Sequence, residues 1–179
     1  NPVWVALDAD FVLMSKKGGE RTIPATKFFL RGYKQINMRC DEIVYAIRVT
    51  LPNSNSFTDA FKQCPRREDD IAIVTSAMSV KLHPENNTIE DIKLAFGGMG
   101  SRTLSATQTE QKLIGKKWGE RETLEEGMNS LSQEMKLEGV VPGGRPEYRT
   151  HLCSSFFYKF FTRTWGERTG EGVEERTGE

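Results

Sequence analysis

A dense charged turn between two apolar segments is the feature that most limits how this chain can fold. Two arginines and three acidic residues, Arg66 to Asp70, follow Pro65, and an apolar run begins directly after them. Charge of this density between core-forming segments places the turn on the rim of a folded body. Most such turns are solvated, and each exposed ion pair contributes about 0–1 kcal/mol. The alternative is that the charges set the potential at the mouth of a pocket. Spacing alone does not decide between the two.

The first part of the chain is predicted to be rich in β-structure. Residues 4–15 alternate loosely and end in an apolar run, which indicates a strand, and residues 20–23 form the returning strand of a hairpin. A second strand is predicted at 41–51, with the odd-numbered apolar side chains from Ile43 to Val49 on one face and Val44 on the other. The polar break that follows marks a domain boundary, so residues 1–52 form one unit and residues 53–163 the next.

The second unit is predicted to be a small antiparallel sheet packed against about three helices, so that the whole chain has an α+β fold. Its strands are expected at 57–62, 77–83 and 88–96, whereas residues 70–76 suit either a helix or a strand. The glycine-rich turn at 96–100 matches neither the dinucleotide fingerprint nor a P-loop. Such a turn can cradle a phosphate at a helix N-terminus. Close backbone packing is its favoured role, and the alternative is that Gly97 and Gly98 lie beside a bound cofactor.

Three helices are expected after this turn. Ser105–Gln108 and Thr123–Glu126 have the pattern of capping boxes, which predicts helices that begin at these residues. The second of these helices buries a stripe that includes either Met128 or Gly127. A third helix, residues 147–162, carries aromatic residues at helical spacing that we interpret as core.

The last residues of the chain have a different composition. Glu-Arg-Thr-Gly-Glu occurs twice within residues 164–179, with only Val173 as an apolar residue between the two copies. Such a segment does not bury enough surface to offset the ordering cost of about 1–2 kcal/mol per residue. It is therefore predicted to be a disordered tail.

The overall composition fits a soluble globular protein. The formal net charge is zero and no apolar run approaches the ~20 residues of a membrane span, so neither nucleic acid nor a membrane is an expected partner. Cys40, Cys64 and Cys153 are far apart and His83 and His151 lack acidic or cysteine partners, so no metal site or catalytic nucleophile is predicted.

Several short motifs together indicate a family. The most specific is Arg66-Arg67-Glu68-Asp69-Asp70-Ile71-Ala72, and further motifs are Asn1-Pro2-Val3, Ala60-Phe61-Lys62-Gln63, Gly97-Gly98-Met99 and the aromatic run from Ser155 to Phe160. With these motifs, residues 1–162 resemble the flavin domain of the xanthine dehydrogenases, within the molybdenum hydroxylase family. The resemblance implies the end of an FAD-binding domain followed by a domain like the C-terminal domain of CO dehydrogenase flavoproteins.

The resemblance also implies the residues of a cofactor site. Val44 and Lys62 would contact FAD, with Lys62 near the polar edge of the flavin. The loop from Gln63 to Ile73 would lie beside the flavin ring and influence the access of NAD. Within it, Arg67, Glu68, Asp69 and Asp70 would form the wall on the nicotinamide side.

The implied function is electron transfer within a larger enzyme. Electrons from hypoxanthine or xanthine, oxidised to urate, would pass from molybdopterin through 2Fe–2S clusters to FAD and then to NAD or oxygen. The other centres and the main FAD-binding stretches would lie in domains outside this sequence, in a homodimer expected in the cytoplasm or in peroxisomes. The fragment alone would be inactive. The alternatives are a flavin domain like that of an aldehyde oxidase, and a truncated remnant without catalysis.

Overall fold

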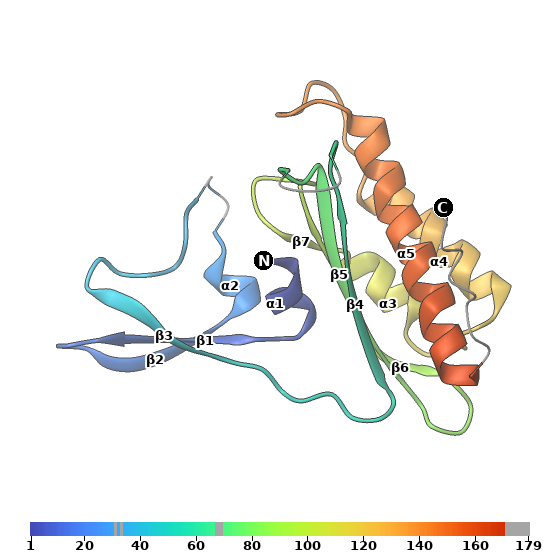
Figure 1. The fold of residues 1–179 in the computed structure, drawn as a ribbon, viewed down its shortest axis with the longest axis horizontal. Helices are drawn as coiled ribbons and strands as arrows, with labels where there is room; N and C mark the ends of the chain where they lie inside the picture. Colours follow the sequence, from blue (N-terminus) through green and yellow to red (C-terminus); the bar gives the residue numbers. More distant parts are fainter. Residues whose placement is uncertain (31, 33, 67–69, 171–179) are drawn as a thin grey trace.

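The first part of the chain forms a three-stranded antiparallel sheet accompanied by two short helices. The computed structural model describes residues 1–30, 32, 34–66 and 70–170. The strand order is β2-β1-β3, with both neighbours antiparallel to β1 (Figure 1). The elements are α1 (Pro2–Ala6), β1 (Asp10–Ser15), β2 (Gly19–Pro24), α2 (Ala25–Phe28) and β3 (Glu42–Arg48). The predicted hairpin and second strand are therefore confirmed.

The strand predicted at 4–15 is wrong in its first half, because residues 2–6 form a helix. Pro2 occupies the first helical position, where its missing N–H costs nothing, and the carbonyl of Asn1 accepts the N–H of Trp4 at 3.1 Å. Val5 and Ala6 are buried against the neighbouring four-stranded sheet. Tertiary packing thus outweighs a weak local alternation.

The second sheet has four antiparallel strands in the order β4-β5-β6-β7. Its strands are β4 (Ser56–Gln63), β5 (Val74–Leu82), β6 (Ile89–Gly97) and β7 (Leu104–Ser105). The strands predicted at 57–62, 77–83 and 88–96 are confirmed, with boundaries that differ by up to three residues. For the open stretch 70–76, residues 74–76 belong to β5, whereas residues 70–73 form neither a helix nor a strand.

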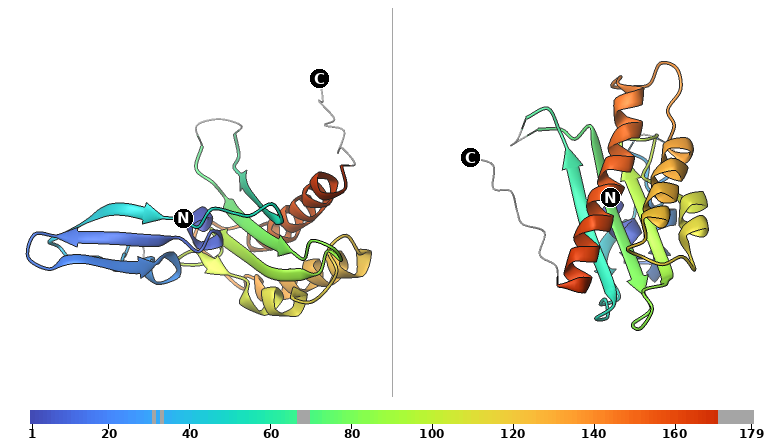
Figure 2. Two further views of the ribbon diagram at one scale, coloured as in Figure 1. Left: turned by 90° about the horizontal axis from the view of Figure 1, so that it is seen from below. Right: turned by 90° about the vertical axis from the view of Figure 1, so that its right-hand side faces the viewer.

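Both faces of this sheet are covered, which makes β5 and β6 almost continuously buried. One face carries helices α3 (Thr107–Leu113), α4 (Arg121–Glu134) and α5 (Pro146–Thr169), and the other carries α1 (Figures 1 and 2). Ala77 and Ala95 belong to the core cluster on the α1 side, where their small side chains let the helix approach closely. The α+β class is confirmed, with two antiparallel sheets and helices between and beside them.

The two predicted capping boxes are wrong. Ser105 is held in β7, where it pairs with Ala95, so α3 begins after Ala106 without a cap from its own segment. The carboxylate of Glu134 on α4 supplies the cap and accepts the N–H groups of Gln108 and Thr109 at 2.9 and 2.8 Å. Helix α4 begins two residues before the predicted cap, and Thr123 is buried in it.

Helix α5 closes the helical face and supplies most of the aromatic core. Its stripe Leu152, Phe156, Phe157, Phe160 and Phe161 is buried, as predicted. Three of these rings surround Trp118, a fully buried residue that the sequence pattern did not single out, at centroid distances of 4.3 to 6.2 Å. A Cβ placed on Gly127 of α4 would lie 2.4 Å from the Phe157 ring, so Gly127, not Met128, marks the close contact between α4 and α5.

The predicted disordered tail is wrong for residues 164–169, which continue α5. Trp165 packs against the core, and the guanidinium of Arg168 donates hydrogen bonds to Asn87 Oδ1 at 2.9 Å and Asn55 Oδ1 at 3.1 Å. These contacts offset the ordering cost of the extra turns. The helix ends at Gly170, whose φ of +72° is left-handed. Residues 171–179 lie outside the described residues.

Candidate functional site

Lys62 lies near the end of β4, the edge strand of the four-stranded sheet, where it pairs with Thr75. Its neighbour Phe61 stacks on Phe156 of α5, with ring centroids 5.5 Å apart. Because successive strand side chains point to opposite faces, the exposed Lys62 side chain points to the face on which α1 lies, away from α5. The ammonium group is therefore available on the side of the molecule that holds the three-stranded sheet.

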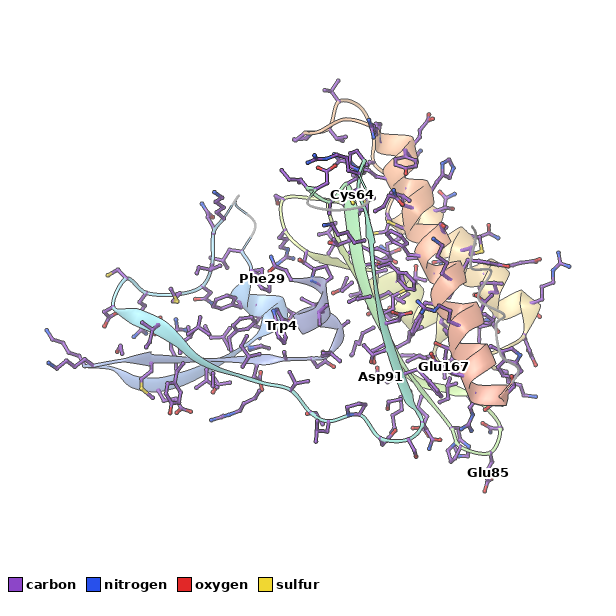
Figure 3. All side chains as sticks on the ribbon, in the orientation of Figure 1. Trp4, Phe29, Cys64, Glu85, Asp91 and Glu167 are labelled. Carbon is purple, nitrogen blue, oxygen red and sulfur yellow. The ribbon has the colours of Figure 1, made fainter. Side chains whose placement is uncertain are left out.

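The charged loop is closed at its base by backbone and side-chain contacts. Gln63 O accepts the N–H of Ile73 at 2.7 Å, and Asp70 Oδ2 accepts the N–H of Arg66 at 2.9 Å. The guanidinium of Arg66 lies 3.5 Å from the same carboxylate, and the Cys64 thiol donates to Arg66 O. Figure 3 shows Cys64 at the end of the long strands. The structure thus brings Lys62 and Asp70 to the same end of β4.

Two of the predicted site residues, Arg67 and Asp69, lie outside the described residues, as does Glu68. Only the residues at the base of the loop can therefore be used to compare a solvated turn with a functional rim. There the Arg66–Asp70 pair is mainly exposed on the arginine side, which is typical of a pair that contributes little to stability.

Val44 lies on β3, in the other sheet, opposite Leu13 of β1. The register shifts between Val12 and Leu13, so that Tyr45 is an extra residue in β3, and both faces of this edge strand are open. Val44 is 42% exposed, Ile43 64% and Tyr45 62%. Three consecutive exposed side chains of this kind make this strip a candidate contact surface. The sequence predicted the alternation of this strand but not that both faces would be open.

The glycine-rich turn packs closely against neighbouring backbone, which is the role that the sequence favoured. Gly98 has a φ of +89°, and a Cβ on it would lie 2.4 Å from the carbonyl oxygen of Ile73. The carbonyl of Gly98 accepts a hydrogen bond from Arg149 of α5 at 3.0 Å. The turn forms one side of a largely apolar cavity of about 560 Å³ that Met99 and Leu137 also line. This cavity contains none of the predicted site residues.

The thiols and acidic groups show no metal-binding arrangement in the part of the chain that the structure describes. Burial raises the pKa of the Cys153 thiol to about 12, so this group stays protonated and inert. No group of three or more His, Cys, Asp or Glu side chains that could hold a metal ion occurs among residues 1–30, 32, 34–66 and 70–170. Within the same ranges, no helix is both long and apolar enough to cross a membrane.

Comparison with protein families identifies the class to which this fold belongs. Residues 59–164 match the model of the CO dehydrogenase flavoprotein C-terminal domain, and residues 1–53 match that of the FAD binding domain in molybdopterin dehydrogenase. The chain belongs to the molybdenum hydroxylase flavoproteins, with a match to their FAD-binding domain followed by a match to their C-terminal domain. The resemblance found in the sequence is confirmed.

Several similar curated proteins are xanthine dehydrogenases. The chain is 40% identical over 161 residues to the xanthine dehydrogenase/oxidase of Rattus norvegicus, and 40% identical over 162 residues to the xanthine dehydrogenase of Emericella nidulans. Xanthine dehydrogenase 1 of Arabidopsis thaliana is 36% identical over 163 residues. Each alignment covers 90% of this chain, which spans only 12% of each relative's length.

Solved structures confirm the fold. The carbon monoxide dehydrogenase of Hydrogenophaga pseudoflava superposes with a TM-score of 0.78 at 23% identity, over 92% of this chain and 55% of that one. Quinoline 2-oxidoreductase of Pseudomonas putida 86 gives a TM-score of 0.72 at 17% identity, over 93% of this chain and 54% of that one. At these identities the likeness shows a shared fold and carries no residue roles.

The available side chains suit two different parts of an FAD molecule. The exposed apolar strip around Val44 offers the kind of surface against which a planar ring packs. The exposed ammonium of Lys62 suits an electron-rich, hydrogen-bond-accepting edge. These two residues lie in different sheets, and the cavity beside the glycine-rich turn includes neither. The chemical character of Val44 and Lys62 therefore fits FAD, the cofactor that the family match names.

Proposed function

We propose that this chain forms one wall of the flavin site in an enzyme of the xanthine dehydrogenase type. The observation that carries the proposal is the 40% identity to xanthine dehydrogenase/oxidase over 90% of the chain, combined with the FAD-binding match at residues 1–53. When bound, FAD would accept electrons derived from hypoxanthine or xanthine and pass them to NAD or oxygen. Because the chain spans 12% of such relatives, the molybdopterin and 2Fe–2S centres belong to the rest of the enzyme, proposed to be a cytoplasmic or peroxisomal homodimer.

In this proposal the residues of the chain have separate tasks. Val44 provides apolar contact for the cofactor, and Lys62 places a positive charge where the reduced ring carries negative charge. Asp70 fixes the base of the loop through its contacts with Arg66, so that Arg67 and Asp69 can form the wall on the nicotinamide side. The two sheets, joined through α1, give these residues a rigid scaffold.

A steady-state assay of the longest gene product that contains this sequence tests the proposal. With xanthine as the reductant, we expect flavin-dependent formation of NADH from NAD. Oxygen consumption without NADH formation would favour the alternative, an aldehyde oxidase-like flavin domain. Absence of flavin from the purified full-length product would favour the remnant without catalysis. Either result would contradict the proposal.

A further inference from the structure

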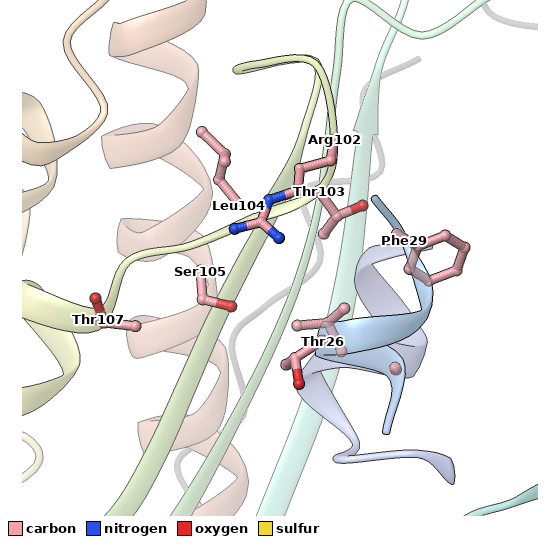
Figure 4. Close-up of a pocket in the computed structure, with 9 residues that line it drawn as sticks. Thr26, Phe29, Arg102, Thr103, Leu104, Ser105 and Thr107 are labelled. Carbon is pink, nitrogen blue, oxygen red and sulfur yellow. The ribbon is translucent and has the colours of Figure 1, made fainter. Parts of the chain in front are cut away.

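We propose that the pocket between α2 and the segment leading into α3 binds a phosphate group or a similar small oxyanion. The pocket has a volume of about 300 Å³ and lies between the two matched domains. Its polar lining residues are Thr26 of α2, Arg102 and Thr103 of the segment after β6, Ser105 of β7 and Thr107 of α3 (Figure 4). It is separate from the proposed flavin contacts, since Val44, Lys62 and Asp70 do not line it.

The polar groups of this pocket have hydrogen-bonding capacity that the protein does not use. Four hydroxyl groups and one guanidinium line a single concavity. Within the described part of the chain, none of these five side chains forms a hydrogen bond or an ion pair with another protein group. The sequence separates Thr26 from the other four by more than 75 residues, and only the fold brings them together. A concavity lined by several donors without protein partners is the arrangement expected of a site for a polar ligand.

The chemistry of the donors selects the class of ligand. The planar guanidinium of Arg102 can donate two parallel hydrogen bonds to neighbouring oxygens of one phosphate. Each hydroxyl can donate one further hydrogen bond. In Figure 4 the guanidinium of Arg102 lies above the Ser105 and Thr26 side chains. The lining also includes apolar residues, among them Val5 and Phe29, which do not compete for the donors.

The charge balance of the pocket also favours an anion. Among the described residues that line it, Arg102 is the only charged one and none is a carboxylate. An adjoining cavity of about 160 Å³ does contain two carboxylates, and both are engaged. Asp8 lies 3.5 Å from Lys93 Nζ, and Glu110 accepts the N–H of Leu94 at 2.7 Å. The volume of the main pocket exceeds that of a bare phosphate, which leaves room for a phosphate monoester.

Calorimetric titration of the 179-residue chain with inorganic phosphate, in a phosphate-free buffer, tests the site. We expect saturable binding that Arg102→Gln weakens roughly tenfold or more, because it removes a charge-assisted pair of hydrogen bonds. The matched control is Arg121→Gln, which removes the same charge from an exposed position on α4 and should leave binding unchanged. Ser105→Ala should weaken binding by a smaller factor, and it keeps the test decisive should Arg102→Gln fold poorly.

The possible outcomes distinguish a site for free phosphate from a site for a nucleotide phosphate, and both from the absence of a site. Equal affinity for inorganic phosphate and adenosine monophosphate would support a site for the free ion, whereas tighter binding of the monophosphate would support one for a nucleotide phosphate. Lack of saturable binding by the wild-type chain would overturn the proposal. So would equal weakening by Arg102→Gln and Arg121→Gln, since that is the signature of diffuse charge. The result does not depend on whether the flavin proposal holds.

Discussion

Glu42 is a buried carboxylate at the start of a strand whose other side chains are largely exposed. Its oxygens accept hydrogen bonds from Arg21 Nε and Nη2 at 2.5 and 2.7 Å and from the backbone N–H of Arg39 at 2.6 Å. The contact with Arg21, aided by the Arg39 N–H, lowers the pKa of Glu42 from 4.5 to about 2. This one side chain therefore ties β3 to β2 and to the preceding loop.

The low pKa of Glu42 predicts a window of pH-dependent stability. Because the folded-state pKa lies below the unfolded value, the stabilisation is complete above about pH 4.5 and is lost as the pH falls toward about 2. Glu42→Gln should lower the urea midpoint at neutral pH, and its difference from wild type should shrink across this window. Glu20→Gln, which removes the exposed pair with Arg48, is the control and should show little change. A difference that stays constant with pH would contradict the role given to Glu42.

At the scale of the elements, the packing of α4 on α5 depends on one glycine. Gly127 is buried in α4, where an added Cβ would meet the fully buried Phe157 ring. Gly127→Ala should destabilise the fold by about 1–2 kcal/mol, because overpacking outweighs the gain in helix propensity. The measurement is a urea titration followed by circular dichroism. Asn129→Ala, at an exposed position of the same helix, is the control, and equal stability of Gly127→Ala and wild type would show that the helices shift freely.

The elements also show which features a sequence pattern can predict. Alternation and turn residues predicted β2, β4, β5 and β6, and the aromatic stripe predicted the buried face of α5, because these signals are local. The cap predicted for α3 was wrong because Glu134, from another helix, supplies the cap that Ser105 was expected to provide. The cap predicted for α4 was wrong because the helix begins at Arg121 and buries Thr123. Helix α5 runs past its predicted end because Arg168 binds two asparagines more than 80 residues away in sequence. Local periodicity contains no information about such partners.

At the scale of the whole molecule, the sequence could predict the family and only part of the site. The Arg66–Ala72 run is specific because it is contiguous, and the family match confirms the resemblance. The positions of Val44 and Lys62 on two different sheets, and the meeting of Thr26 with Arg102, depend on the fold. We propose that residues 1–52 and 53–163 are two domains. The pocket between α2 and the β6–α3 segment is lined by residues of both.

Lys62 is the residue on which the proposed wall of the flavin site depends most. The direct test is a redox titration of the flavin in the full-length enzyme and in its Lys62→Ala variant, together with the flavin content of each. Because a cation stabilises the reduced, negatively charged ring, Lys62→Ala should lower the midpoint potential or the FAD occupancy. Lys159→Ala, at an exposed position on α5, should change neither. An unchanged potential and an unchanged occupancy in Lys62→Ala would contradict the placement of this chain at a flavin site.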